Sequence, residues 1–178
     1  MILRKLRQSD YELIQAAMEA IRRNYVEERH HVGCAVRTGS GKIYTGVHLE
    51  STGHDVCAEP VALGAAAAAG ERDFACIVAV AMRRKNDRRP RVLSPCGVCR
   101  ELLTCHWPEM EVIVAVRGEL RKTLARELLP APYIRPRSGA ARAAPATQGQ
   151  RASRQQATGN GQQEEAVAQT RVPARKNR

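Results

Sequence analysis

Two short cysteine-containing stretches hold the residues of this chain that are best suited to chemistry. The first is residues 57–59, Cys-Ala-Glu, and the second is residues 95–100, Pro-Cys-Gly-Val-Cys-Arg. Cys96 and Cys99 are three residues apart, so on one helical turn both sulfur atoms face the same side and can bind one metal ion. Cys57 would supply a third thiolate. This pattern predicts one zinc ion per chain, bound by these three cysteines.

Three protein ligands leave a tetrahedral zinc ion with one open position, whereas structural sites use four protein ligands. A water molecule bound there has its pKa lowered to about 7, and a nearby base must carry its proton. Glu59, two residues after a ligand, is the candidate catalytic residue. A structural zinc site or reduced core cysteines would be the alternative for an isolated Cys-x-x-Cys pair. His54, three residues before Cys57, could close the site as a fourth ligand.

The residues around these stretches resemble the cytidine deaminase superfamily, and within it most closely the enzymes that deaminate blasticidin S. Such deaminases pair a non-ligand glutamate with a Pro-Cys-x-x-Cys segment. The similarity covers about residues 10–135 and is carried by residues 46–48, 57–64, 76–80, 93–101 and 126–130, with Tyr133. The superfamily has no ligand at the position of His54.

The resemblance implies zinc-dependent hydrolytic removal of the 4-amino group of a cytosine nucleoside. The substrate would be cytidine, deoxycytidine or an analogue, and the products its uracil form and ammonia, as in pyrimidine salvage. Glu59 would take a proton from the attacking water, pass it to the ring nitrogen N3, and then protonate the departing amine. A blasticidin S-specific resistance enzyme is the alternative substrate branch.

The resemblance also implies roles for residues around the metal. His48, Glu50, Ala58 and Tyr133 would contact the substrate, and Arg100 would hydrogen-bond a ligand sulfur. Glu50 matches the superfamily's ribose-binding Asn-x-Glu pair, but His48 replaces its asparagine. The simpler interpretation of His48 is a histidine at a strand end whose hydrogen bonds are satisfied. The simpler interpretation of Arg100 is an ordinary surface arginine.

Arg135 stands where the blasticidin S deaminases have a tryptophan, which counts against that antibiotic as the specific substrate. Deamination within nucleic acid is a further alternative, but it calls for a basic body with stacking aromatic residues. Aromatic residues make up only 3% of this chain. A structural zinc module or a nucleic-acid-associated binding module is the alternative outside enzymes.

Elements that would position these residues can be read from the hydrophobic pattern. The pattern predicts four helices, which run from Asp10 to Arg23, from Cys57 to about Ala69, from Cys96, and over 123–129. Ser9 and Glu12 are predicted to form a capping box at the start of the first helix. Strands are predicted at 32–37, 42–48, 74–82 and 112–116. Residues 83–91 read as a charged loop. We therefore expect an α/β fold, a three-layer α/β/α sandwich with a central mixed sheet, as in the resembled superfamily.

The composition of the chain changes after about residue 130, which indicates two regions. Residues 131–178 hold 9 of the 29 Lys and Arg but 2 of the 18 Asp and Glu, and they are poor in bulky apolar residues. We expect a catalytic domain at 1–136 and a disordered basic tail at 137–178, which would bind nucleic acid weakly at most.

The other expectations concern the cysteines, the compartment and assembly. Cys34, Cys76 and Cys105 are expected to be packing residues. No signal peptide or membrane span is recognisable, and metal-bound thiolates fit a reducing cytoplasm. The resemblance implies a homotetramer whose pockets are completed across subunits.

Overall fold

Residues 1–87 and 89–133 are described by the computed structural model of the chain. The elements are α1 (Gln8–Asn24), β1 (Val32–Thr38), β2 (Ile43–Val47), α2 (Ala58–Ala68), β3 (Phe74–Ala81), β4 (Arg91–Leu93), α3 (Gly97–His106), β5 (Glu111–Val116), β6 (Glu119–Leu124) and the 3-10 helix η1 (Ala125–Leu128). The predicted tail at 137–178 lies outside the described residues, so its disorder and the boundary after residue 136 stay predictions.

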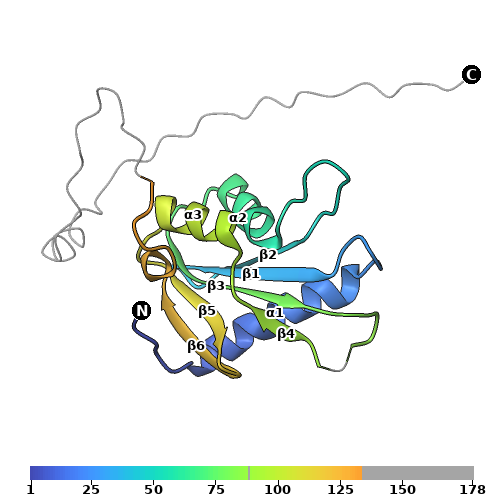
Figure 1. Ribbon diagram of the computed structural model, residues 1–178, viewed down its shortest axis with the longest axis horizontal. Coiled ribbons are helices and arrows are strands. Elements are labelled where there is room, and N and C mark those ends of the chain that lie inside the picture. The colour runs from blue at the N-terminus through green and yellow to red at the C-terminus, as the bar shows by residue number, and fades with distance from the viewer. Residues whose placement is uncertain (88, 134–178) are drawn as a thin grey trace, which may run out of the picture. The chain divides into compact units, whose positions relative to one another are not determined.

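The strands form one mixed sheet in the order β2-β1-β3-β5-β6, with β4 paired to β3. The β3–β5 pair is parallel, and the other pairs are antiparallel. Helix α1 lies on one face of the sheet, and α2 and α3 lie on the other (Figure 1). The fold is the predicted three-layer α/β/α sandwich.

Strands β4 and β6 were not predicted. The three residues of β4 follow the charged loop and pair with the last residues of β3. Strand β6 follows a tight turn in which both Arg117 and Gly118 have positive φ, +50° and +82°, as in the turns that favour hairpins. The predicted helix at 123–129 is wrong, because its first residues end β6 and only Ala125–Leu128 form a short 3-10 turn.

Side chains alternate along the strands and so build two apolar cores. One core lies between the sheet and the α2/α3 layer and includes Cys34, Val36, Leu63, Ile77 and Val112. The second core lies between the sheet and α1 and includes Leu13, Ala17, Ala35, Val78 and Ile113. No helix in the described part of the chain is long and apolar enough to cross a membrane.

Glycine at position 46 lets α2 lie directly on β2. A Cβ atom added to Gly46 would come within 2.4 Å of the backbone nitrogen of Ala62 and 2.9 Å of the carbonyl oxygen of Ala58. The start of α2 therefore touches the strand backbone. This contact sets the height of the first helical turn above the sheet.

A buried ion-pair network ties α1 to the sheet on the face opposite α2. The carboxylate of Asp10 is fully buried and lies 3.1 Å from the Arg37 guanidinium and 2.9 Å from Lys122 Nζ. Lys122 also pairs with Glu111 at 2.7 Å. The Asp10 carboxylate accepts a 2.8 Å hydrogen bond from the backbone N–H of Arg7, so Asp10 closes the start of α1 in place of the predicted Ser9/Glu12 pair.

Candidate metal centre and substrate pocket

The three predicted metal ligands come from the starts of two helices on the same face of the sheet. Cys57 is the N-cap residue of α2, Cys96 is the N-cap residue of α3, and Cys99 lies in the first turn of α3. A helix start carries a partial positive charge, which favours the thiolate form of a cysteine placed there. Pro60 is compatible with the first turn of α2, where its missing N–H has no helical partner.

The structure brings the three sulfur atoms together. All three lie within 4.8 Å of one another, and the Sγ atoms of Cys57 and Cys96 are 3.6 Å apart. Cys99 is fully buried, whereas Cys96 is exposed, so the group has a closed side and an open side. His54 is exposed and is not part of the group. Three converging thiols with one open side fit a zinc ion that keeps a position for water.

Burial and backbone hydrogen bonds act differently on the three thiols. Burial raises the pKa of Cys57 and of Cys99. Burial also acts to raise the pKa of Cys96, but hydrogen bonds from the backbone N–H groups of Cys99 and Val98 help to leave it lowered. Since zinc requires thiolates, binding of the ion would release protons from this group.

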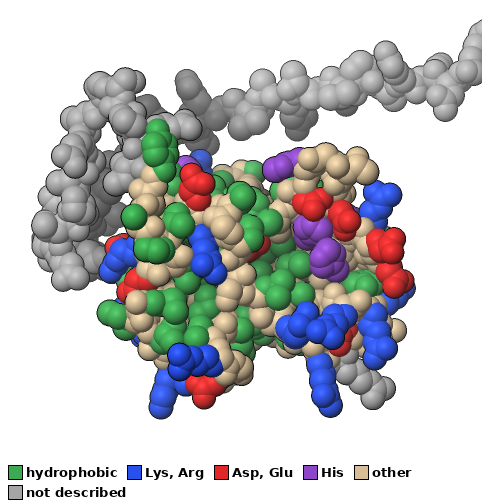
Figure 2. Space-filling view, in the orientation of Figure 1, with side chains coloured by type: hydrophobic (Ala, Val, Ile, Leu, Met, Phe, Trp, Pro, Cys, Tyr) green, Lys and Arg blue, Asp and Glu red, His purple; other side chains and the backbone are tan. Residues whose placement is uncertain are grey.

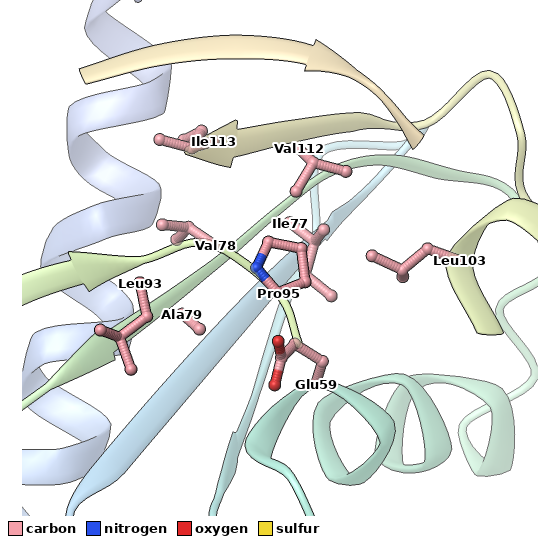
Figure 3. Close-up of a pocket in the computed structure, with 9 residues that line it drawn as sticks. All are labelled: Glu59, Ile77, Val78, Ala79, Leu93, Pro95, Leu103, Val112 and Ile113. Carbon is pink, nitrogen blue, oxygen red and sulfur yellow. The ribbon is translucent and has the colours of Figure 1, made fainter. Parts of the chain in front are cut away.

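Glu59 lies in the first turn of α2 with only 6% of its surface exposed. It lines a small space together with aliphatic side chains of β3 and β5 and with Pro95 and Leu103 (Figure 3). The space among these side chains admits no water molecule. Burial raises the pKa of Glu59, although hydrogen bonds from its own backbone N–H and from Cys99 act in the opposite direction. A carboxyl group whose pKa is raised in this way is suited to accept and release a proton.

A small pocket of about 110 Å³ opens in front of these groups. It is lined by Val32, His48, Cys57, Ala58, Glu59, Ala79, Leu93, Ser94 and Cys96. Two of the cysteines and the buried carboxylate thus face one cavity with mostly apolar walls. A flat, largely apolar ring with a polar edge fits such a cavity.

The predicted residues His48, Glu50 and Ala58 lie in or beside this pocket, and Ala58 and His48 line it. His48 is 9% exposed, and its Nδ1 atom has no hydrogen-bond partner among the described residues. Glu50 is exposed in an adjoining groove that includes Arg29 and His31. Three of the four predicted substrate-contacting residues are therefore gathered at one place.

Within this chain, Tyr133 does not reach the pocket and Arg100 does not reach a cysteine sulfur. Tyr133 is 73% exposed and does not line the pocket of its own chain. The Arg100 guanidinium donates hydrogen bonds to the carbonyl oxygens of Pro95, at 2.9 Å, and Leu128, at 3.4 Å, instead of to a ligand sulfur. Arg100 therefore fixes the segment that leads into Cys96.

Several pocket residues were not found by sequence reasoning. Val32, Ala79, Leu93 and Ser94 reach the cavity only because β1, β3 and β4 pair in this register. Their residue types carry no signal of their own. Among the other cysteines, the predicted packing role fits Cys34 and Cys76, which are buried, but is wrong for Cys105, which is exposed.

Comparisons with known proteins agree with this geometry. The sequence profile described as "Cytidine and deoxycytidylate deaminase zinc-binding region" matches residues 7–115. Blasticidin-S deaminase from Bacillus cereus is 44% identical over 132 residues, which is 72% of this chain and 94% of that protein. Cytidine deaminase from Halalkalibacterium halodurans is 30% identical over 126 residues, 68% of this chain and 91% of that protein.

Among solved structures, cytidine deaminase from Burkholderia pseudomallei is 34% identical, with a TM-score of 0.56, and the match covers 69% of this chain and 98% of that chain. The segment that matches the profile contains Glu59 and all three cysteines predicted to bind the metal.

Proposed function

This chain belongs to the cytidine and deoxycytidylate deaminase family, and we propose that Cys57, Cys96 and Cys99 hold its zinc ion and that Glu59 is its catalytic residue. The reaction is the zinc-dependent hydrolytic removal of the 4-amino group of a cytosine nucleoside or analogue. The observation that carries the residue assignment is the buried Glu59 carboxylate, which faces the same pocket as two of the three converging thiols.

Zinc held by the three thiolates would activate a water molecule for attack on the amino-bearing carbon C4 of the ring. Glu59 accepts a proton from the attacking water and delivers it to ring nitrogen N3. It then carries the second proton to the departing amino group, so that the C4–N bond breaks and ammonia leaves. The aliphatic side chains beside Glu59 exclude water from that side of it.

The sugar of the substrate would lie toward His48 and Glu50, at the mouth of the pocket. The unpaired Nδ1 atom of His48 supports this placement, because a buried polar atom without a partner is suited to bind a ligand. The 44% identity to a blasticidin-S deaminase, against 30% to a cytidine deaminase, supports an analogue of that kind as the second candidate substrate. Cytidine and deoxycytidine, as in pyrimidine salvage, are the first.

A homotetramer in the cytoplasm completes the proposal. The part of α2 after Glu59, from Pro60 to Ala68, has no charged residue, although Gly64, Ala65 and Ala68 are exposed. Such a helix face is suited to contact another subunit. The exposed Tyr133 would then reach the pocket of a neighbouring subunit. The three zinc-binding thiols are compatible with a reducing compartment.

Glu59→Gln, measured beside Glu101→Gln, tests this assignment. Both glutamates stand two residues after a cysteine ligand, but Glu101 is exposed. The loss of the cytosine absorbance band is followed with cytidine, deoxycytidine and blasticidin S, and zinc per chain is measured for each protein. We expect Glu59→Gln to keep its zinc and lose at least about 10²-fold in kcat, because a positioned proton carrier contributes about that much.

Glu101→Gln should keep both activity and zinc. Loss of zinc from Glu59→Gln, or full activity in that variant, would contradict the catalytic assignment of Glu59.

A further inference from the structure

Beside the cysteine centre, a second group of metal-ligating side chains lies at the mouth of the pocket. His31, His48 and Glu50 each offer one ligand atom, and these atoms lie within 4.8 Å of one another. Figure 2 shows histidine and acidic side chains gathered on the surface at the end of the sheet where β1 begins. No part of the proposed deamination uses His31.

The backbone brings these three residues together. The N–H of His48 donates to the carbonyl oxygen of Val32 at 2.9 Å, so the ladder between β1 and β2 continues past the end of β2. The N–H of Glu50 then donates to the carbonyl oxygen of Arg29 at 3.3 Å. Residues two apart in an extended segment share a face, which places His48 and Glu50 on one side, with His31 across from them.

Local contacts hold the two imidazole rings in place. The rings of His31 and His48 meet edge to face with their centroids 4.6 Å apart. Nδ1 of His30 lies 2.7 Å from the carbonyl oxygen of His48 and fixes the backbone there. Farther along the loop, the Asp55 carboxylate accepts a 2.9 Å hydrogen bond from the N–H of Ser51.

The donor atoms of this group are not engaged elsewhere. His48 is nine-tenths buried, and its Nδ1 atom is the one buried side-chain nitrogen or oxygen in residues 1–87 and 89–133 without a partner. Within the same residues, the side chains of His31 and Glu50 make no hydrogen bond or ion pair that would have to break.

The group of Asp10, Cys76 and Glu111 is also close enough to hold an ion. Its two carboxylates, however, are already neutralised by Lys122, Arg37 and Arg4. Of the two groups outside the cysteine centre that residues 1–87 and 89–133 contain, the histidine group is therefore the one with donors available for a cation.

We propose that His31, His48 and Glu50 form a second binding site for a divalent transition-metal ion of the zinc, nickel or copper class. Two imidazoles and one carboxylate suit these ions, whereas magnesium and calcium prefer oxygen ligands. The ion would leave positions open to solvent, because Glu50 is exposed. Since His48 also lines the pocket, an ion bound there would stand where the substrate's sugar enters; this consequence depends on the proposed function.

The test is to count ions on the full chain. The zinc-loaded protein is titrated with additional zinc, and the bound metal is measured by calorimetry and by metal analysis after gel filtration. We expect two ions per chain in the unaltered protein and one in His31→Ala. The control is His54→Ala, which removes an exposed histidine of the neighbouring loop and should still bind two ions.

Cobalt provides a spectroscopic check on which site is filled. Co²⁺ added to the zinc-loaded protein should bind without the intense near-ultraviolet absorption of a cobalt–thiolate centre, because the new ligands contain no sulfur. Retention of the first zinc by His31→Ala shows that the variant is folded. One ion in the unaltered protein, two ions in His31→Ala, or loss of the second ion from His54→Ala would overturn the proposal.

Activity measurements separate this proposal from the proposed function. For each protein, the activity with excess zinc is compared with its own activity without added zinc. Excess zinc should inhibit deamination by the unaltered protein and by His54→Ala, but not by His31→Ala. If the chain bound two ions and deaminated no cytosine compound, the second site would stand and the proposed function would fail. If the chain deaminated a cytosine compound but bound only one ion, the proposed function would stand and the second metal site would fail.

Discussion

The carboxyl group of Glu59 must ionise to act as a base, but its buried surroundings disfavour the ionised form. Because burial raises its pKa above the usual value of 4.5, the folded chain holds the proton more tightly than the unfolded chain does. The contribution of Glu59 to the stability of the fold is therefore largest below pH 4.5 and falls as pH rises through the folded-state pKa. Above the folded-state pKa, the buried ionised carboxylate destabilises the protein.

Glu59→Gln should therefore unfold at a higher temperature than the unaltered protein at neutral pH, with zinc bound in both. The difference should shrink as the pH is lowered, over the range in which both proteins keep their zinc. Thermal unfolding of both proteins across this range checks the prediction, with Glu101→Gln as the control that should change little because its side chain is exposed. An unfolding temperature for Glu59→Gln at or below that of the unaltered protein at neutral pH would count against it.

His48 is expected to decide between substrates. Replacing it with asparagine, the residue that the superfamily pairs with glutamate for ribose, should raise kcat/KM for cytidine relative to blasticidin S by about tenfold, roughly the contribution of one hydrogen bond. The ratio is measured by competition between the two substrates. His54→Asn, outside the pocket, should leave it unchanged; an unchanged ratio in His48→Asn as well would remove His48 from substrate choice.

The residues that the sequence predicts to be reactive do lie together, but most of their neighbours in the pocket were not predicted. Cys96, Cys99 and Glu59 are recognisable because local spacing on a helix fixes how such residues can cooperate. His31 has no local signal, since its partner His48 stands 17 positions later in sequence and meets it only through strand pairing. The contacts of Arg100 were likewise not visible, because Leu128 arrives from a distant turn.

At the scale of elements, the contact between α2 and β2 is sensitive to a single added atom. Gly46→Ala would place a Cβ atom against the α2 backbone at 2.4 Å. We expect a loss of about 1–3 kcal/mol in the free energy of unfolding, as for other overpacked sites, together with weaker zinc binding because Cys57 begins that helix.

Urea unfolding and zinc competition with a chelator measure both effects. Gly53→Ala is the matched control, since an added Cβ atom there meets nothing within 4 Å. If Gly46→Ala bound zinc as tightly as the unaltered protein, the position of Cys57 would not depend on the close contact between α2 and β2.

Helices and strands were predicted correctly where one strong hydrophobic pattern covers the segment. The prediction failed where a segment becomes a strand only by pairing with its neighbour. The apolar run at 74–82 and the helix faces of α1 were visible directly, and β3 and α1 form there. Strand β6 contains Glu119, Arg121 and Lys122, so its sequence reads as polar. It becomes a strand because β5 is available to pair with it and because the buried Lys122 finds carboxylate partners.

At the scale of the whole molecule, the buried network around Asp10 joins α1, β1, β5 and β6. Asp10→Asn should lower the free energy of unfolding by about 3–5 kcal/mol, the usual result of breaking a buried ion pair on one side. Glu19→Gln is the control: it removes an exposed pair with Arg23 on the same helix and should cost about 0–1 kcal/mol. Urea unfolding at neutral pH compares the two.

The pH dependence of this difference follows from the pKa of Asp10. Burial alone would raise it, but hydrogen bonds from the Arg7 backbone, Lys122 and Arg37 outweigh burial and hold it below the usual 3.8. The stability due to Asp10 is therefore present above pH 3.8 and disappears as pH falls through the lower folded-state value. A difference between Asp10→Asn and the unaltered protein that already vanished near neutral pH would show that the network does not stabilise the fold.

The water-free aliphatic surroundings behind Glu59 also have a consequence for isotopes. A carboxyl group closed off on that side can exchange hydrogen with the solvent only through the pocket, and bound substrate fills the pocket. The hydrogen taken from the attacking water should then be the same hydrogen that arrives on the substrate ring, without mixing with the bulk. During a single turnover begun by rapid transfer from H₂O into D₂O, the product would keep this hydrogen only while it stays bound, because the N3 hydrogen of a uracil ring exchanges with bulk water after release.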